Sequence, residues 1–554
     1  MKRFAVATLA ALAACGGSAP DTGPTPATMP KSRSETTKYL ETSHYADVIA
    51  YLDSLQKLGV PMYRTTLGTS TEGRAIPMVV LSRPLVHSPA EAHALGRPIV
   101  WVQANIHSNE IEGKEAMLAM IRNLPTAQWR NVLDSVVLIV IPIYNPDGNE
   151  KFAAQAVNRP EQNGPEMVGQ GTNGQGLNLN RDYVKIEAPE TRAEFAAMNA
   201  WSPDVFMDLH TTDGSFHGYA LTYSPSLSPD AFFGGVYARD SILPAVRARM
   251  KQRHGYATYD YGNFAVEYNG DTKTDTVKQG WFTYDSRPRF GTNYMGVRGR
   301  IGILAEGYSH DPFATRITSM YFFVREILAY TAEHGTEIMA LSKRADSTVT
   351  AWGEAPSNAP AISLRSTLAR SPLDDVVIAE DLVRTGDSAL TQAGVPKGLK
   401  RTGHFRAQKM PVYVAFEPTL TRKLPYGYAV PASDTAALRV LKTHGVLMQP
   451  LQSPWLVLVQ QFRLDSVHHA DRPFQGHYET SVVGRWSEAV VTLPAGSVLV
   501  RTAQPLGLVA FYLLEPESDD GLITWNFFDA SLTAGGIFPV LRIPGSFGAL
   551  SEPR

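Results

Sequence analysis

The sequence predicts an α/β domain, in which helices flank a mixed and mostly parallel sheet, followed by a β-rich C-terminal domain. Three features support this prediction: apolar runs of strand length, helix-like stretches between them, and a change of composition near residue 345. Continuous apolar strands that alternate with helices are typical of sheets buried on both faces. At 554 residues the chain is also too long for one ordinary core, so two domains are expected.

The first domain is predicted to begin with a helix. Residues 39–58 carry apolar side chains at helical spacing, and Gly59 is a suitable helix stop. Five apolar runs follow as predicted strands: residues 76–81, 99–104, 136–144, 205–209 and 301–305. Two stretches of helix-like composition lie among them: residues 112–124 and 187–200.

The composition changes after this domain, which is expected to cover residues 37–345. Residues 346–375 are rich in Ser, Ala, Thr and Pro and are expected to form a linker. Residues 376–554 are expected to form a β-rich accessory domain, because short apolar runs are separated there by turn residues. Those runs are residues 411–416, 455–462, 497–502 and 506–514.

The N-terminus has the pattern of an export signal. Lys2 and Arg3 precede a short apolar stretch, residues 4–14, which is too short to span a bilayer. The tetrad Leu-Ala-Ala-Cys that ends at Cys15 resembles the bacterial lipobox, in which the cysteine is diacylated and becomes the mature N-terminus. We therefore expect lipidation at Cys15. The alternative is an ordinary signal peptide with an incidental cysteine.

The expected lipid anchor would hold the exported protein at a bacterial membrane. Cys15 is the single cysteine of the chain, so its lipidation would leave none for a disulfide. Two or more acyl chains give stable anchoring. Residues 16–36 are small, polar and Pro-rich, which suits a flexible tether after a signal peptide over residues 1–15. By resemblance to lipoprotein sorting rules, Gly16 favours the outer membrane, at its periplasmic or surface face.

The overall composition argues against some classes of function. A hydrophobic content of 44% and a charged content of 19% describe a folded globular protein. The formal net charge of -2 gives no electrostatic case for a nucleic-acid partner, which would call for a basic patch. No apolar run after residue 20 is long enough to span a bilayer.

Polar residues follow the predicted strands at the points where the strands end. Asn105 and His107 follow one strand, His210 ends a second, and Glu306 ends a third. Ligand sites in α/β sheets gather beyond the carboxyl ends of the strands. The sequence therefore predicts one polar site at this edge of the sheet.

His107 and Glu110 form an HxxE tetrad, which can bring an imidazole and a carboxylate onto one cation. A hydrolytic zinc site needs three protein ligands if water is to keep the fourth position. His210 is the best candidate for the third ligand, because it also ends a strand. Alone, an HxxE tetrad is often incidental, but together with His210 it favours a site for one zinc ion.

An ordered set of motifs over residues 39–330 resembles the carboxypeptidase A-like metallocarboxypeptidases. The set comprises GTSTEGR at 68–74, HSNE at 107–110, NPDG at 145–148, Asn180-Arg181, DLH at 208–210 and Glu306. The resemblance implies a carboxypeptidase-like fold and zinc-dependent hydrolysis of peptides at the C-terminal residue. The C-terminal part of the chain resembles appendages seen in some bacterial members.

The resemblance also implies a role for each site residue. His107, Glu110 and His210 would bind the zinc, and Glu306 would act as general base and acid. Asn180 and Arg181 would hold the terminal carboxylate of the substrate, for which the planar fork of arginine is suited. Two further roles are implied: Arg159 would stabilise the oxyanion, and either Tyr284 or Tyr294 would close over the substrate.

The chain departs from the family pattern at Asn178, where many members have an aspartate that accepts a hydrogen bond from a zinc-binding histidine. An amide oxygen can still accept this bond but carries no charge. Weaker metal binding is the expected consequence, with Asp208 as the compensating carboxylate.

Alternative functions remain at this point. Zinc acylases of the aspartoacylase kind share the HxxE tetrad, a later histidine and an Asn-Arg pair, and they act on acylated amino acids. Cell-wall stem peptides are an alternative to nutrient peptides as substrates. A lipoprotein that binds peptides without hydrolysing them is the alternative from a different class. An inward-pointing arginine before Glu306 would favour acidic terminal residues; the candidates are Arg287, Arg289, Arg298 and Arg300.

Overall fold

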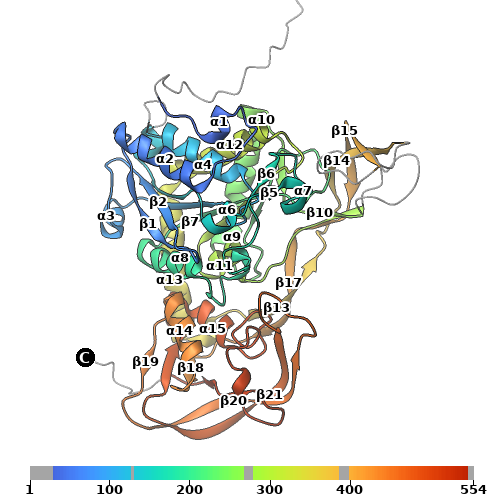
Figure 1. Ribbon diagram of the computed structural model, residues 1–554. Coiled ribbons are helices and arrows are strands. Elements are labelled where there is room, and N and C mark those ends of the chain that lie inside the picture. The colour runs from blue at the N-terminus through green and yellow to red at the C-terminus, as the bar shows by residue number, and fades with distance from the viewer. Residues whose placement is uncertain (1–28, 126–129, 267–278, 386–397, 547–554) are drawn as a thin grey trace, which may run out of the picture.

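The computed structural model describes residues 29–125, 130–266, 279–385 and 398–546. These residues form an α/β domain and, below it in Figure 1, a smaller domain that contains the C-terminal sheet. The predicted signal peptide, Cys15 and most of the predicted tether lie outside the described residues. Among the described helices, none combines the length and the apolar character that crossing a membrane requires.

The first domain is built on an eight-stranded mixed sheet with the order β1-β2-β4-β3-β7-β12-β8-β9. The strands β4, β3, β7 and β12 run parallel to one another, whereas β1, β2 and β8 each pair antiparallel with a neighbour. This confirms the predicted fold class. The strands are β1 (Tyr63–Thr69), β2 (Ala75–Leu81), β3 (Ile99–Ala104), β4 (Val137–Ile141), β7 (Val205–Thr211), β8 (Leu221–Pro225), β9 (Thr258–Asp260) and β12 (Ile301–Gly307).

Helices cover both faces of this sheet, so its central strands are buried on both sides. In β3, for example, Val100 and Val102 pack into one core cluster and Trp101 packs into the other. Burial on both faces explains why the strands read as continuous apolar runs. The cluster of Val100 includes residues of α2 (Tyr45–Lys57), α4 (Glu112–Asn123), α10 (Leu243–His254) and α12 (Phe313–Glu333); that of Trp101 includes residues of α8 (Pro189–Trp201) and α11 (Gly291–Val297).

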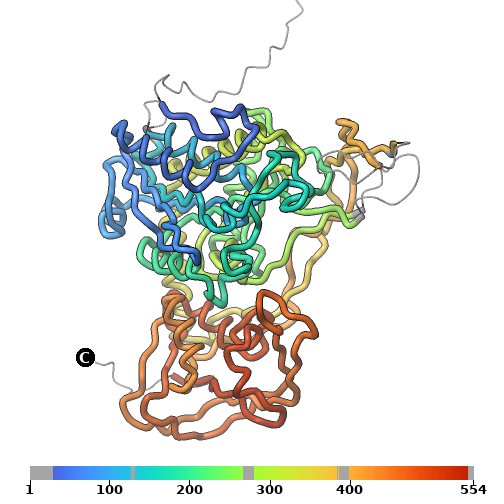
Figure 2. Tube along the Cα trace, viewed as in Figure 1, coloured from blue at the N-terminus to red at the C-terminus, as the bar shows by residue number. Residues whose placement is uncertain are grey.

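The segment expected to be a linker, residues 346–375, is largely regular structure. Helix α13 (Gly335–Glu354) includes the first residues of this segment. It continues past residue 345 because Ala345 and Val349 are buried on the helix face that also carries Leu341. Strand β13 (Ile362–Ala369) follows and pairs with β17 (Ala415–Arg422). In Figures 1 and 2 this pair lies between the two domains.

The first part of the expected accessory domain packs back onto the α/β domain. The hairpin of β14 (Asp375–Arg384) and β15 (Leu399–Met410) contacts it through a bridge between Ala379 and His217. Strand β16 (Val412–Tyr413) extends the pair β10 (Asn263–Val266) and β11 (Gln279–Phe282). The predicted boundary at residue 376 therefore does not separate two compact units.

The C-terminal domain is β-rich and also contains helices. Its six-stranded sheet has the order β19-β22-β18-β23-β20-β21. The strands are β18 (Gly427–Val430), β19 (Gln449–Pro450), β20 (Trp455–His469), β21 (Thr480–Leu493), β22 (Val498–Arg501) and β23 (Leu541–Ile543), and the helices are α14 (Thr435–His444) and α15 (Gly507–Leu514). The prediction of a strand over residues 506–514 is wrong. Every residue of α15 is buried, and periodicity does not separate a short buried helix from a strand.

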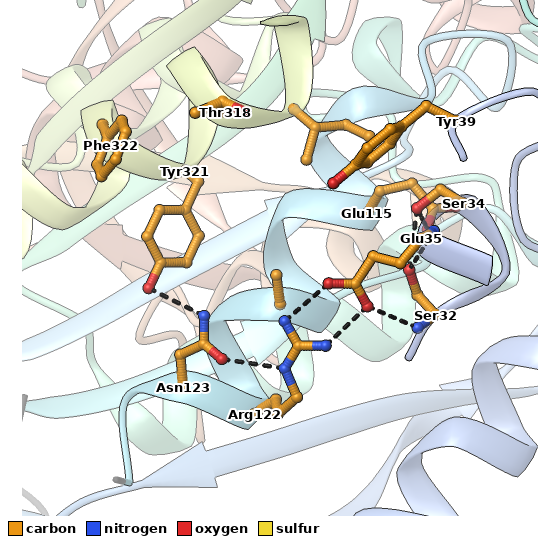
Figure 3. Close-up of a pocket in the computed structure, with 12 residues that line it drawn as sticks. Ser32, Ser34, Glu35, Tyr39, Glu115, Arg122, Asn123, Thr318, Tyr321 and Phe322 are labelled. Atoms are coloured by element: carbon orange, nitrogen blue, oxygen red, sulfur yellow. Dashed lines mark hydrogen bonds and ion pairs between the residues drawn. The ribbon is translucent and has the colours of Figure 1, made fainter. Parts of the chain in front are cut away.

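The N-terminal segment packs on α4, so the last residues of the predicted tether are ordered. Helix α1 (Arg33–Thr36) has a capping box in which Ser32 and Glu35 bond to each other's backbone amides. Glu35 also accepts two hydrogen bonds from Arg122, at 2.7 and 2.8 Å, as Figure 3 shows. These residues line a cavity of about 110 Å³, with Glu115 in its wall.

We predict that Glu115 contributes strongly to stability. Its buried carboxylate accepts hydrogen bonds from Ser34, Thr42 and Ser43 at 2.7–3.0 Å. Glu115→Ala should lower the free energy of unfolding by about 2–3 kcal/mol, because buried donors lose their acceptor. Urea denaturation of residues 29–554 checks this, with the exposed Glu417→Ala as the control. Equal stability of the two variants would contradict the docking of this segment.

Candidate active site

The candidate site lies where strands β3, β7 and β12 end. His210 on β7 is paired directly with Glu306 on β12, so the two side chains project from the same face of the sheet. His107 follows the end of β3 after Asn105, which has a φ of +67°. The amide of Glu110 then donates to the carbonyl of His107 at 3.0 Å, which closes a tight turn and brings both side chains to the same place.

His107, Glu110 and His210 form a donor set for one metal ion. The Nδ1 atom of His107 lies 3.0 Å from Oε1 of Glu110, and the Nδ1 atom of His210 lies 2.8 Å from Oε2. One ligand atom from each residue lies within 4.8 Å of the other two. Two imidazoles and one carboxylate, with room for a water ligand, are the donors of hydrolytic zinc sites. The residues therefore fit zinc.

The other nitrogen of each histidine faces a side-chain oxygen. Nε2 of His107 lies 2.9 Å from Oδ1 of Asn178, and Nε2 of His210 lies 2.9 Å from Oδ2 of Asp208. The hydrogen bond to Asn178 holds the proton of His107 on Nε2 and leaves the lone pair of its Nδ1 for the metal. Asn178 therefore occupies the place expected for the family's aspartate. Asp208 does not compensate for the missing charge at this position, because it lies beside His210 and not beside His107.

Burial and charge both act on the metal ligands. Burial would raise the pKa of Glu110, but His107, Arg159 and His210 hold it well below its usual value. Burial would likewise lower the pKa of His210, but Asp208 and Glu110 raise it well above its usual value. The carboxylate of Glu110 therefore stays charged and available to a cation.

Glu306 is buried at the end of β12, next to the metal ligands. Burial raises its pKa well above the usual glutamate value; Glu110 and Asp213 raise it further, and His210 and Arg159 oppose this effect. Its Oε2 atom makes no hydrogen bond within the described part of the chain. A carboxyl group with a raised pKa can take up and release a proton near neutral pH.

Arg159 lies beside the metal ligands, as expected from the sequence. Its guanidinium is 3.1 Å from Oε1 of Glu110 and donates to the carbonyl oxygens of Thr211 and Thr212 at 2.7 and 3.0 Å. Glu161 contacts its Nε at 2.7 Å. These contacts fix the positive charge at the end of β7.

Arg181 is largely surrounded by protein and lies against an aromatic ring. Its guanidinium stacks on the ring of Phe290, 3.9 Å from the centroid, and donates to the carbonyl of Asn180 at 2.8 Å. Among the described residues, no carboxylate lies within ion-pair distance of it. Burial, together with Arg289, lowers the pKa of Arg181 to about 10. A cation held in this way can bind an external anion.

Asn180 connects Arg181 to the metal ligands. Its Nδ2 lies 3.3 Å from Nε2 of His210, and its Oδ1 accepts from the amide of Gly291 at 3.0 Å. The structure therefore brings the predicted Asn-Arg pair and the metal centre together.

The structure separates the two candidate tyrosines. Tyr294 donates to, or accepts from, Nδ1 of His444 at 2.9 Å and packs against Phe195 in the core, so the prediction that it could close over the substrate is wrong. Tyr284 lies near the site, with its hydroxyl 3.3 Å from Oδ1 of Asn293. Burial raises the pKa of Tyr284; Ser224 opposes this effect, and the charge of Glu306 adds to it.

None of the four arginines before Glu306 carries the expected preference for acidic residues. Each one is held by a partner within the protein: three form ion pairs, and Arg298 donates to the amide oxygen of Asn199. The pairs are Arg287 with Asp285, Arg289 with Glu479 and Asp520, Arg298 with Asn199, and Arg300 with Asp346.

The segment at 68–74 and the NPDG motif form one structural unit. The buried carboxylate of Asp147 accepts from the hydroxyl of Ser70, the amide of Glu72 and the guanidinium of Arg74, each at 2.7 Å. This unit supports the segment that follows β4.

One residue next to the site was missed by the sequence analysis. Gln475 of the C-terminal domain accepts a hydrogen bond from the amide of Asn178 at 2.7 Å. The two residues are 297 positions apart, and no local pattern around a single glutamine indicates such a contact.

We predict that Asn178 controls metal affinity. Asn178→Leu should weaken zinc binding about 10- to 100-fold, because His107 loses the acceptor that orients its ring. Asn178→Asp should strengthen binding, because it restores a charge while keeping the acceptor. Competition for zinc with a chromophoric chelator measures both effects. Equal affinity of the leucine variant and the wild type would show that Asn178 does not orient His107.

Several known carboxypeptidases are similar to this chain or to parts of it. The zinc carboxypeptidase family model matches residues 48–292. Carboxypeptidase 2 of Trichophyton rubrum is 23% identical over 500 residues, which cover 86% of this chain and 81% of that protein. The catalytic chain of human carboxypeptidase N is 33% identical over 129 residues, 22% of this chain and 26% of its own. The metallo-carboxypeptidase of Burkholderia cenocepacia shares 17% identity, with a TM-score of 0.39 over 53% of this chain and 70% of its own. Residues 48–292 therefore match the zinc carboxypeptidase family.

Proposed function

We propose that this protein removes C-terminal residues from peptides. Besides the three metal ligands, five residues would act on the substrate: Glu306, Arg159, Arg181, Asn180 and Tyr284. The observation that carries the proposal is Arg181, a sequestered cation with no carboxylate partner among the described residues, connected through Asn180 to His210 of the metal centre. A guanidinium in this state suits the free carboxylate at the end of a peptide. Its position would place the last peptide bond near Glu306.

Glu306 and Arg159 would act on the reacting atoms. When bound by His107, Glu110 and His210, zinc supplies an acidified water and a Lewis acid for the carbonyl oxygen. Glu306 would accept the proton of the attacking water and then deliver it to the departing amine. Arg159, fixed at the end of β7, would stabilise the negative charge that develops on the carbonyl oxygen.

Substrate recognition would rest on Arg181, Asn180 and Tyr284. Arg181 would hold the terminal carboxylate, and Asn180 would support it from the side of His210. Tyr284 is the tyrosine that remains to close over the substrate, since Tyr294 is a core residue. Nutrient peptides are favoured over cell-wall stem peptides, because no feature of the sequence indicates recognition of D-amino acids.

The proposed activity predicts which peptides are cleaved. A mixture of peptides, each present with a free and an amidated C-terminus, should lose terminal residues from the free acids alone. Glu306→Gln should lower the rate about 10²- to 10⁴-fold, because it removes the proton acceptor, and a chelator should abolish activity. Mass spectrometry of the products measures the loss. Cleavage of acylated amino acids in preference to peptides would instead favour an acylase, and equal turnover by the glutamine variant would exclude Glu306 as the base.

We also propose that the protein is a lipoprotein of the outer membrane, held by acyl chains on Cys15. The support is the sequence pattern that ends at Cys15 and the Pro-rich segment that follows it. In a bacterial host grown with a radiolabelled fatty acid, the wild type should carry label and sediment with outer membranes. Cys15→Ser should lose the label and leave the membrane fraction. Label retained by the serine variant would refute lipidation at this residue.

A further inference from the structure

The C-terminal domain reaches the candidate site through a tight turn between β20 and β21. Phe474 and His477 exchange two backbone hydrogen bonds, at 2.7 and 3.0 Å, across Gln475 and Gly476. These two central residues have φ values of +51° and +83°, as the common two-residue hairpin turn requires. The turn is therefore a compact unit that can hold a side chain at a fixed position.

Gln475 connects this turn to the residues that serve both metal and substrate. Its Oε1 accepts from the backbone amide of Asn178 at 2.7 Å. The side-chain Oδ1 of Asn178 accepts in turn from Nε2 of His107 and from the amide of Asn180, each at 2.9 Å. One hydrogen bond from the C-terminal domain thus fixes the residue on which a metal ligand and Asn180 both depend.

The same turn makes a second contact just beyond Arg181. Nε2 of His477 lies 2.9 and 3.0 Å from the two oxygens of Glu187. Glu187 also pairs with Lys185 at 3.1 Å, and Lys185 pairs with Asp182 at 2.6 Å. The segment that carries Arg181 is therefore held by the turn on both sides, at Asn178 and at Glu187.

The C-terminal domain also holds the ring beneath Arg181. Arg289, which precedes Phe290, donates from its amide and its Nε to the buried carboxylate of Asp520 at 2.7 and 2.8 Å. Its guanidinium stacks on Trp525, 4.6 Å from the ring centroid. The guanidinium of Arg181 stacks on Phe290. The C-terminal domain therefore holds both the segment that carries Arg181 and the ring on which Arg181 rests.

We propose that the turn at residues 474–477 is a positioning element for the substrate carboxylate, with Gln475 as its main residue. Gln475 acts through Asn178 on Asn180 and Arg181. The proposal rests on the carboxylate-binding role proposed above for Arg181. It assigns a part in substrate binding to a domain that lies outside the residues matched by the family model, 48–292.

The test uses Gln475→Ala in zinc-loaded protein that also carries Glu306→Gln, so that binding is measured without turnover. Calorimetry should show that a free-acid peptide binds about three- to tenfold more weakly, because the loop at Asn178 loses one hydrogen bond. The amidated form of the same peptide should bind unchanged. Gln452→Ala is the matched control, since Gln452 is an exposed glutamine of the same domain whose recorded side-chain hydrogen bond is local, to Pro450.

A second measurement reads the contact itself. In zinc-free protein, amide exchange of the segment around Asn178 should become about three- to tenfold faster in Gln475→Ala and stay unchanged in Gln452→Ala. Gln475→Glu keeps an oxygen acceptor and should restore the slow exchange.

Unchanged exchange, or unchanged binding of the free-acid peptide, would overturn the proposal. Equal weakening of the acid and the amide would overturn it too, because the effect would not concern the carboxylate. Failure of the wild type to cleave peptides would count against the proposed function, while both measurements would still decide this proposal.

Discussion

The parallel pairing of β7 with β12 is the constraint on which the site depends. Its register sets His210 opposite Glu306, so a metal ligand and the proposed base leave the sheet side by side. The pairing of β3 with β7 then brings the turn of His107 and Glu110 to the same edge. A shift by one residue would turn these side chains to the opposite face. Burial of the strands between two layers of helices makes such a shift costly.

Among the described residues, Arg181 is a cation of the site with no carboxylate partner. Glu110 is compensated by two imidazoles and Arg159, and the four arginines before Glu306 are held by partners within the protein. Arg181 differs from them, because it rests on an aromatic ring and a carbonyl oxygen. The structure keeps it in place through neighbours of the C-terminal domain. The terminal carboxylate of a bound peptide would neutralise the charge of Arg181. This requirement explains how the site would select the last residue of a peptide over internal residues.

Much of the first domain and of its site could be predicted from the sequence. Strands buried on both faces produce continuous apolar runs, and polar residues at their ends converge because parallel strands finish at one edge. The site contacts of Gln475 and Asp520 could not be predicted, because they join segments far apart in the chain through single side chains. Residues 507–514 were misread because a fully buried helix has no polar face. Tyr294 could not be assigned to the core before its partner His444 was known.

The most direct test of this account is the Michaelis constant of Arg181→Met for a free-acid peptide that the wild type cleaves. The account predicts a rise of about 30-fold or more in KM, with unchanged zinc content, because a charge-assisted pair with the terminal carboxylate is lost while the metal ligands remain. Methionine keeps much of the apolar contact with Phe290. A KM within twofold of the wild type would contradict the central claim, because the unpaired cation would then not be the place where the end of the peptide binds.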